Sequence, residues 1–482
     1  MSGKTLKERT ATGLMWGAVN NLLTQLLSAM IGIVLARLLS PADYGLVGML
    51  AIFSAIANSL QESGFTAALT NLKQVTHREY NAVFWFSTSM AVVLYTLLYF
   101  MAPLIARFFH QPELTSLSRL YFLAFVFSGL GVAHAAHLFR NMMNREKTII
   151  GLIALIGSSA LGLILAWQGY AYWSLAWMQV AYIVIGDCGR LYYVRWLPSL
   201  DIDLKPLRQM FGFSSKILAT NIVNQVTNNI LSFIFGRLFT AQQVGNYTQA
   251  NKWNNMGNSF VSGTIQQIAQ PVLSSIADER DRQVRVFRKI LRFTVFLSFP
   301  AMFGLAAVSQ EFIFVTLGPK WADSAALLQI LCIGGAFIPV CALYQNLAVS
   351  RGRSDIYMWC TLSLIATQIA LILYCQQYGM KTMVAVYTLL NMVWVGVWQL
   401  MCHRLIGIRH RDFLKDIVPF MVIAVAVIAL VYYLTMGIQQ PVVLLCLRIP
   451  LCALLYFIVL RMAHTKILED CLEYVRKIKI KN

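Results

Sequence analysis

Long apolar stretches alternate with short polar connections along almost the whole chain. A helix needs about 20 apolar residues to cross the hydrocarbon layer, and in lipid its backbone groups must bond to one another. The pattern therefore predicts an all-α, polytopic membrane protein with about fourteen transmembrane helices. The apolar stretches cover residues 12–36, 45–69, 81–105, 117–139, 148–167, 171–194, 212–236, 246–275, 290–310, 323–349, 356–375, 382–402, 416–436 and 441–460.

The basic residues are distributed unevenly between the two sides of this map. With the N-terminus in the cytoplasm, 31 of the 39 lysines and arginines fall on the inner side and 6 on the outer side. Lys252 and Arg448 lie within predicted spans. Because inner loops of membrane proteins are enriched in Lys and Arg, this split predicts that both termini are cytoplasmic, in a bacterial inner membrane.

The overall composition agrees with a membrane protein. Hydrophobic residues make up 58% of the chain and charged residues 12%, which is more apolar side chain than one soluble core could bury. The net charge of +19 follows from the topology and from contact with anionic lipid, so we expect no nucleic-acid partner. The nine cysteines lie mostly in apolar runs without a CxxC pair, which predicts neither a disulfide framework nor a zinc site.

An internal repeat relates two parts of the chain. Segments 11–70 and 211–270 align without gaps at a constant offset of 200, and most of the identities are polar. Both copies enter the membrane from the same side, which predicts two similar six-helix lobes related by an axis along the membrane normal. The identical pairs are Asn21/Asn221, Gln25/Gln225, Arg37/Arg237, Leu38/Leu238, Gly45/Gly245, Asn58/Asn258 and Ser59/Ser259.

The repeat and the helix map together predict the organisation of the chain. We expect an N-terminal lobe over residues 1–197 and a C-terminal lobe over 198–405. Helices thirteen and fourteen, over 406–462, are then an addition to the two lobes. A basic cytoplasmic tail over 463–482 ends the chain.

Polar residues recur on one face of helices one, two, seven and eight. Polar side chains are costly in lipid, so they face another helix or a water-filled cavity. Interhelical hydrogen bonding explains any single Asn or Ser, but four striped helices in two matching pairs favour a central hydrophilic cavity between the lobes. The predicted substrate-cavity residues are Asn21, Gln25, Asn58, Asn221, Gln225, Asn228, Lys252, Asn255 and Asn258, with Arg37 and Arg237 at the outer helix ends.

Three kinds of charged position carry separate expectations. Lys252 lies about two turns into the eighth helix and would attract a phosphate or an acidic sugar. Glu62, near the inner end of the second helix, is the candidate for proton or sodium coupling, although it could instead pair with a cytoplasmic Lys or Arg. Arg37 and Arg237 could equally extend to the membrane interface without binding substrate. No constellation predicts a catalytic or metal site, so we expect no enzyme and no cofactor.

Short motifs occur in a fixed order at the predicted helix ends. They are Ala36–Gly45 (ARLLSPADYG), Gly236–Leu238, Val244–Tyr247, Pro271–Ser274, Leu317–Trp321 and Gly352–Asp355. With these motifs the chain resembles, over about residues 5–460, the polysaccharide transport family. These are the flippases of lipid-linked oligosaccharides within the multidrug/oligosaccharidyl-lipid/polysaccharide exporter superfamily. The resemblance is greatest to the branch that moves colanic-acid-like or capsule-like units.

The resemblance implies a fold, a substrate and a mechanism. The fold would be two six-helix bundles plus two terminal helices, with a cavity that opens alternately to each side. The substrate would be an undecaprenyl-pyrophosphate-linked oligosaccharide repeat unit, flipped to the periplasmic leaflet for exopolysaccharide, capsule or O-antigen biosynthesis. Transport would use an H⁺ or Na⁺ gradient, since the chain has no P-loop motif. Membrane lipids, a polymerase and other glycan-assembly proteins are the implied partners.

Alternative functions fit the sequence less well. A multidrug or cation exporter of the same superfamily would favour carboxylates in the cavity, and only Glu62 and Asp187 fall clearly within predicted spans. A glycan polymerase or ligase commonly has a large outer loop, whereas the longest outer connection is about 106–116. A structural scaffold would leave the paired polar faces without a purpose.

Overall fold

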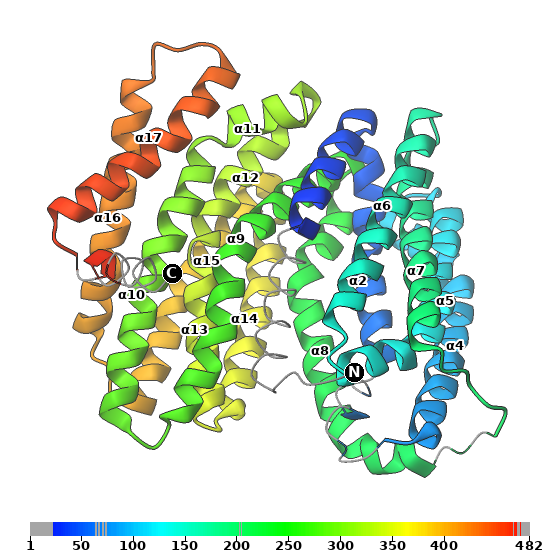
Figure 1. Ribbon diagram of the computed structural model, residues 1–482. Helices are drawn as coiled ribbons and strands as arrows, with labels where there is room; N and C mark the ends of the chain where they lie inside the picture. Colours follow the sequence, from blue (N-terminus) through cyan, green and yellow to red (C-terminus); the bar gives the residue numbers. More distant parts are fainter. Residues whose placement is uncertain are drawn as a thin grey trace. The chain divides into compact units, whose positions relative to one another are not determined.

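The computed structural model describes residues 23–62, 65, 68, 69, 72, 75–201, 203, 205–465, 467–469 and 473. All regular elements in these ranges are helices (Figure 1). The first half contains a helix over Leu23–Leu38, then α2 (Pro41–Glu62), α4 (His77–Phe109), α5 (Leu114–Arg140), α6 (Asn144–Trp167), α7 (Tyr172–Val194) and α8 (Lys205–Leu238). The second half contains α9 (Ala241–Ser275), α10 (Arg280–Ala307), α11 (Ser309–Thr316), η1 (Pro319–Trp321), α12 (Ala322–Gly335), α13 (Ile338–Ser350), α14 (Ser354–Tyr374), η2 (Gln376–Tyr378), α15 (Gly379–Ile406), α16 (His410–Leu434) and α17 (Pro441–Met462).

The predicted helical class is confirmed. Each of the fourteen apolar stretches corresponds to a helix in the described ranges, and α12 and α13 share one stretch. Among the described residues, ten segments are long and apolar enough to cross a membrane by length and composition. The chain is therefore a multi-pass membrane protein. Residues 12–22 of the first stretch, and almost all of the predicted tail from residue 470, lie outside the described residues.

Helix starts follow from local hydrogen bonding. The first turn of a helix leaves backbone N–H groups without intrahelical partners. At the start of α4, the Arg78 N–H donates to Thr76 Oγ1 at 3.3 Å, while the Thr76 N–H donates to Glu79 Oε2 at 2.7 Å. This reciprocal capping box fixes where the helix begins.

The stretch predicted as one helix over 323–349 is interrupted between α12 and α13. Pro339 lies at the start of α13, and its ring nitrogen cannot donate a hydrogen bond to the preceding turn. The carbonyl of Ala336, at the break, accepts a hydrogen bond of 2.7 Å from the Ser298 hydroxyl of α10. The interruption therefore leaves this buried carbonyl satisfied.

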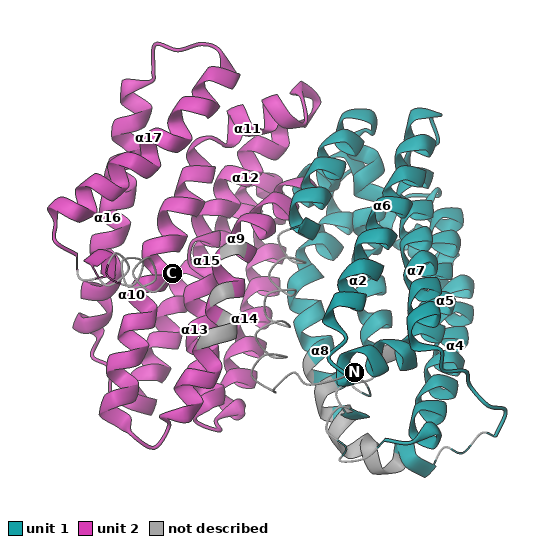
Figure 2. Ribbon diagram, viewed as in Figure 1, with its two compact units in different colours: residues 1–248 teal, residues 249–482 magenta. Residues whose placement is uncertain are grey.

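The chain divides into two compact units, residues 1–248 and 249–482, with the division inside α9 (Figure 2). In unit 1, α2 packs on α8 and α5, while α7 packs on α5 and α6. In unit 2, α10 packs on α12 and α16, α12 packs on α15, and α16 packs on α17. The predicted lobe boundary at 197/198 falls between α7 and α8, whereas α8 packs within unit 1.

Ion pairs attach α16 and α17 to the rest of unit 2. Arg288 of α10 donates from Nε to Asp416 Oδ2 at 2.6 Å and from Nη2 to Oδ1 at 3.1 Å. On α17, Arg448 donates from Nη1 to Glu311 Oε1 of α11 at 2.6 Å. The side chains of Asp416 and Arg448 are only 4% and 6% exposed. Because removing one member of a buried pair leaves an uncompensated charge, these contacts fix where the two added helices pack.

Candidate functional site

The helices that carry most of the predicted site residues, α8 and α9, are unusually polar for membrane-spanning segments. They contain 34 and 35 residues, which is long enough to cross a bilayer. Eleven of the α9 residues are Asn or Gln. A helix with so many amides must face protein or water within a membrane, because lipid cannot satisfy them. The composition of these two helices therefore marks them as the candidate polar path.

The first copy of the repeat supplies four predicted substrate-cavity residues and the coupling candidate Glu62. Gln25, on the helix Leu23–Leu38, and Asn58, on α2, are half-buried, whereas Arg37 is exposed. Glu62 is the last residue of α2, and its side chain lies outside the described part of the structure. Asn21 is also outside the described residues.

The second copy places its stripe along α8. Asn221 and Gln225 are half-buried one turn apart, and Asn228 is exposed. The neighbouring Asn229 donates from Nδ2 to the Gln225 carbonyl at 2.9 Å. The Gln225 side chain is not used in that bond, so it stays available for a ligand or a neighbouring helix.

On α9 the predicted residues have different surroundings. Lys252 is half-buried and pairs with no carboxylate in the described ranges, and Asn255 is exposed. Asn258 is only 5% exposed and donates from Nδ2 to the Asn254 carbonyl at 3.1 Å. A Cβ at Gly335 of α12 would lie 2.9 Å from Asn258 Nδ2. Asn258 thus packs against α12 inside unit 2, while Lys252 and Asn255 retain surface that a ligand could reach.

Arg237 makes several contacts with the turn between α4 and α5. Its Nη1 donates to the Phe108 carbonyl at 2.9 Å and contacts the His110 ring, and its guanidinium carbon lies 5.4 Å from the centroid of the Phe108 ring. The sequence analysis left open whether this arginine binds substrate or extends to the interface. In the structure it ties the end of α8 to α4 within unit 1.

The two copies of the repeat form matching helix starts. Before α2, the Ser40 hydroxyl and N–H both donate to Asp43 Oδ2, at 2.7 and 2.8 Å. Before α9, the Thr240 hydroxyl and N–H both donate to Gln243 Oε1, at 3.3 and 3.2 Å. Ser40 and Thr240, like Asp43 and Gln243, are related by the offset of 200. Two different residue pairs therefore build the same cap at equivalent positions.

Directly after these caps, α2 and α9 cross at a pair of glycines. A Cβ at Gly45 would lie 1.8 Å from the Ala241 carbonyl oxygen, and one at Gly245 would lie 1.7 Å from the Pro41 carbonyl oxygen. Positions 41/241 and 45/245 are again equivalent in the repeat. The identity of Gly45 and Gly245 follows from this contact, because only glycine lets the two backbones approach so closely.

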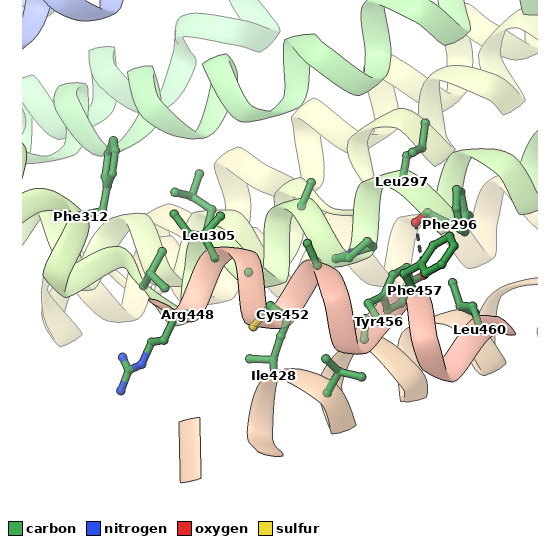
Figure 3. Close-up of a pocket in the computed structure, with 18 residues that line it drawn as sticks. Phe296, Leu297, Leu305, Phe312, Ile428, Arg448, Cys452, Tyr456, Phe457 and Leu460 are labelled. Carbon is green, nitrogen blue, oxygen red and sulfur yellow. Dashed lines mark hydrogen bonds between the residues drawn. The ribbon is translucent and has the colours of Figure 1, made fainter. Parts of the chain in front are cut away.

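Unit 2 also contains an apolar cavity of about 570 Å³ lined by α10, α16 and α17, with Phe312 of α11 (Figure 3). Its polar groups are few. Arg448 lies at one end, and the Tyr456 hydroxyl donates to the Phe296 carbonyl at 3.2 Å. Residues of the predicted polar stripes do not line this cavity. Such a surface suits hydrocarbon and offers few partners to a glycan.

Sequence reasoning found Arg448 within a span but did not find its partners. Its Nε donates to Thr435 Oγ1 at 2.9 Å, and its guanidinium lies 4.7 Å from the centre of the Tyr432 ring. Glu311, which completes this set, is 137 positions away in the chain. An arginine inside a membrane span is energetically unfavourable without a partner. The position of Arg448 within a span could therefore have indicated that an acidic partner exists.

No group of three or more His, Cys, Asp or Glu side chains in the described ranges is arranged to hold a metal ion. The buried ionisable groups instead form ion pairs, such as Arg448 with Glu311, or a set in which Arg288 and Arg292 both contact Asp416. The predicted site residues are mainly amides, and Lys252 is the cation among those on α9. This chemistry suits hydrogen bonding to a polar ligand and attraction of a negative charge.

Comparison with known proteins identifies relatives. The profile of the family described as "Polysaccharide biosynthesis protein" matches residues 34–326. The lipopolysaccharide biosynthesis protein WzxC of Escherichia coli (strain K12) is 24% identical over 360 residues, covering 73% of this chain and 72% of that protein. The teichuronic acid biosynthesis protein TuaB of Bacillus subtilis (strain 168) is 22% identical, covering 82% and 83%.

A solved structure shares the fold. The lipid II flippase MurJ, in an inward closed conformation, superimposes with a TM-score of 0.77 at 13% identity. The superposition covers 94% of this chain and all of that one. At this identity the likeness shows a common fold.

Proposed function

Because the chain belongs to the polysaccharide biosynthesis protein family, we propose that it flips undecaprenyl-pyrophosphate-linked oligosaccharide repeat units across the bacterial inner membrane. The units would serve exopolysaccharide, capsule or O-antigen biosynthesis. The observation that carries the proposal is the family match over residues 34–326, which includes α2, α8 and α9. The names of WzxC and TuaB, which concern lipopolysaccharide and teichuronic acid, support it.

The chemistry of the polar helices suits this substrate. A glycan and a pyrophosphate cannot leave water for hydrocarbon without a large desolvation penalty. The amides of α8 and α9 can replace water around sugar hydroxyls, and Lys252 offers a positive charge to the pyrophosphate or an acidic sugar. The lipid tail can remain in the hydrocarbon while the head group moves.

The predicted substrate-cavity residues are retained as the proposed contacts. Those with side-chain surface in the structure are Gln25, Arg37, Asn58, Asn221, Gln225, Asn228, Lys252 and Asn255. Asn258 packs in unit 2 and Arg237 is held by the α4–α5 turn, so these two would act by positioning α9 and α8. Asn21 lies outside the described residues and keeps its predicted role as a contact. Glu62, whose side chain is also outside them, remains the sequence's candidate against which any other coupling residue is tested.

Transport proceeds by alternating access driven by an ion gradient. The fold shared with a flippase captured in an inward closed conformation supports alternation. The lack of a P-loop motif in the sequence supports an ion gradient over ATP. The predicted excess of lysines and arginines on one side, 31 against 6, supports cytoplasmic termini. A polymerase that consumes the repeat units on the outer leaflet would be a functional partner.

Deletion of the gene in its native host tests the proposal. We expect loss of the surface polysaccharide and accumulation of its lipid-linked repeat unit on the cytoplasmic leaflet, both reversed by the intact gene. Unchanged surface polysaccharide together with hypersensitivity to cationic drugs would overturn the proposal and favour the exporter alternative.

A further inference from the structure

Asp187 of α7 is a buried carboxylate inside unit 1. The residue is 6% exposed, and α7 packs on α5, α6 and α2. An ionised carboxylate in such surroundings is unfavourable unless its oxygens are satisfied. Neither the cap of α7 nor any step of the proposed transport requires an acid at this position.

The two oxygens of Asp187 have different partners. Oδ1 accepts a hydrogen bond from Arg190 Nη1, one turn further along α7. Oδ2 is buried and has no hydrogen-bond partner in the described part of the chain. Nearly all buried polar atoms in folded proteins have a hydrogen-bond partner. A buried carboxylate oxygen without one therefore requires a reason.

Helix α5 leaves space for this pair. A Cβ at Gly131 would lie 1.9 Å from Asp187 Oδ1 and 2.7 Å from Arg190 Nη1. Any larger residue at position 131 would therefore displace the carboxylate and the guanidinium together. The contact between α5 and α7 is built around this ion pair.

Other charged groups on the packed helices lie elsewhere. Helix α6 has no ionisable residue between positions 148 and 167. On α5, Arg119 lies near the outer end, and His134, His137 and Arg140 lie toward the inner end. On α2, Asp43 caps the outer end and Glu62 ends the helix. His134 contacts the carbonyl oxygens of Leu130 and Trp196. Arg190 is thus the charged group in contact with Asp187.

We propose that Asp187 is the proton-binding site that couples transport to the proton gradient. This inference rests on the proposed function and names the ion and the residue. One free lone pair is sufficient for a proton, whereas a hard metal cation requires several oxygen ligands at once. The proton is taken from water on one side of the membrane and released to water on the other, with no covalent change to the protein.

Proton binding changes the contact between α5 and α7. In the charged state Asp187 forms an ion pair with Arg190, whose side chain is 32% exposed. In the protonated state the carboxyl is neutral, Oδ2 becomes a donor, and Arg190 loses its counter-ion. A bound proton can bias a conformational equilibrium only if the two states bind it with different affinity. The ion pair opposite Gly131 supplies such a difference.

Asp416 of α16 is a matched control. Its side chain is also buried, at 4% exposed, but Arg288 and Arg292 engage both of its oxygens. It has no free lone pair of the kind that Asp187 Oδ2 offers. Glu62→Gln tests the coupling candidate from the sequence, and loss of the gradient response in that variant alone would overturn the assignment to Asp187.

The test uses the full-length protein in proteoliposomes. The probe is the fluorescently labelled lipid-linked repeat unit extracted from the host, followed with and without an imposed pH gradient. For one proton per cycle, a gradient of about one pH unit can change the driven rate up to roughly tenfold. We expect wild type and Asp416→Asn to respond, each normalised to its own rate without a gradient. We expect Asp187→Asn to flip lipid at a rate that the gradient does not change.

Infrared difference spectroscopy of the purified protein gives an independent readout. Titration of wild type should show a protonated-carboxyl band that Asp187→Asn lacks and Asp416→Asn retains. A full gradient response in Asp187→Asn, an unchanged band, or a wild type driven by sodium alone would overturn the proton site. Absence of any lipid movement by wild type would instead reject the proposed function, and the infrared band would still decide whether Asp187 binds a proton.

Discussion

At the scale of single residues, the closest backbone approach among the glycines that the structure describes is the crossing of α2 and α9 at Gly45 and Gly245. The repeat made these identities visible in the sequence, but only the structure gives their reason, which is the approach of each glycine to a backbone carbonyl of the other helix. Backbone atoms cannot rotate away as a side-chain end can. A methyl group at either position must therefore separate the two helices.

Gly45→Ala and Gly245→Ala should each destabilise the protein, by about 1–3 kcal/mol as for other overpacked sites. The measurement is thermal unfolding in detergent. Once one alanine has separated the helices the second costs less, so the double variant should be less destabilised than the sum of the two. Gly151→Ala is the matched control, since a Cβ there meets nothing within 4 Å. Equal stability of Gly45→Ala and Gly151→Ala would contradict the crossing.

The charge of Lys252 is expected to contribute to transport. If its ammonium group contacts the pyrophosphate or an acidic sugar, Lys252→Ala should weaken transport by roughly tenfold, because a hydrogen bond to a charged group is worth about 1.5–3 kcal/mol. Lys252→Arg keeps the charge and should lose less. Initial flipping rates at low substrate concentration give the comparison. Equal rates in all three proteins would reject this role.

At the scale of helices, the number and approximate position of the elements could be predicted from the sequence. Apolar length determines them, because a bilayer requires about 20 apolar residues for each crossing. The break between α12 and α13 was missed, since a proline such as Pro339 can either kink or end a helix. The pairs Arg288–Asp416 and Arg448–Glu311 join helices 128 and 137 positions apart. No local pattern shows which distant charge will be adjacent.

The buried pair between α11 and α17 gives the helix-scale prediction. Arg448→Met alone leaves Glu311 buried and unpaired, and we expect a loss of about 3 kcal/mol or more. Adding Glu311→Gln removes the uncompensated charge and should restore part of that stability. Thermal unfolding of the two single variants and the double variant completes the cycle. A double variant less stable than Arg448→Met would show that the pair is not what attaches α17.

At the scale of the whole molecule, the proposed orientation rests on the lysine and arginine count and can be tested by labelling. In a variant without native cysteines, a cysteine at Gln168 should react with a membrane-impermeant maleimide added outside intact cells. A cysteine at Asn141, at the opposite end of α6, should react only after the membrane is opened. Both positions are exposed. The reversed pattern would invert the proposed topology.

The candidate site was only partly accessible to sequence reasoning. The repeat points to α8 and α9 as the candidate helices, because their amides are too numerous for lipid-facing segments, and this assignment stays a prediction. It could not separate Asn258, which packs against Gly335, from Asn255, which is exposed. Asp187 was visible as an acid within a span, but its free Oδ2 and the space left by Gly131 appear only when α5 and α7 are packed together.

Transbilayer movement of a labelled lipid-linked oligosaccharide, measured in proteoliposomes that contain the purified protein, tests the central claim most directly. The label on the outer leaflet is destroyed by an impermeant reagent, so movement appears as label that becomes accessible with time. We predict movement well above that in protein-free vesicles, and faster under an imposed proton gradient. A correctly folded protein that leaves the host's own repeat unit on its original leaflet would contradict the account.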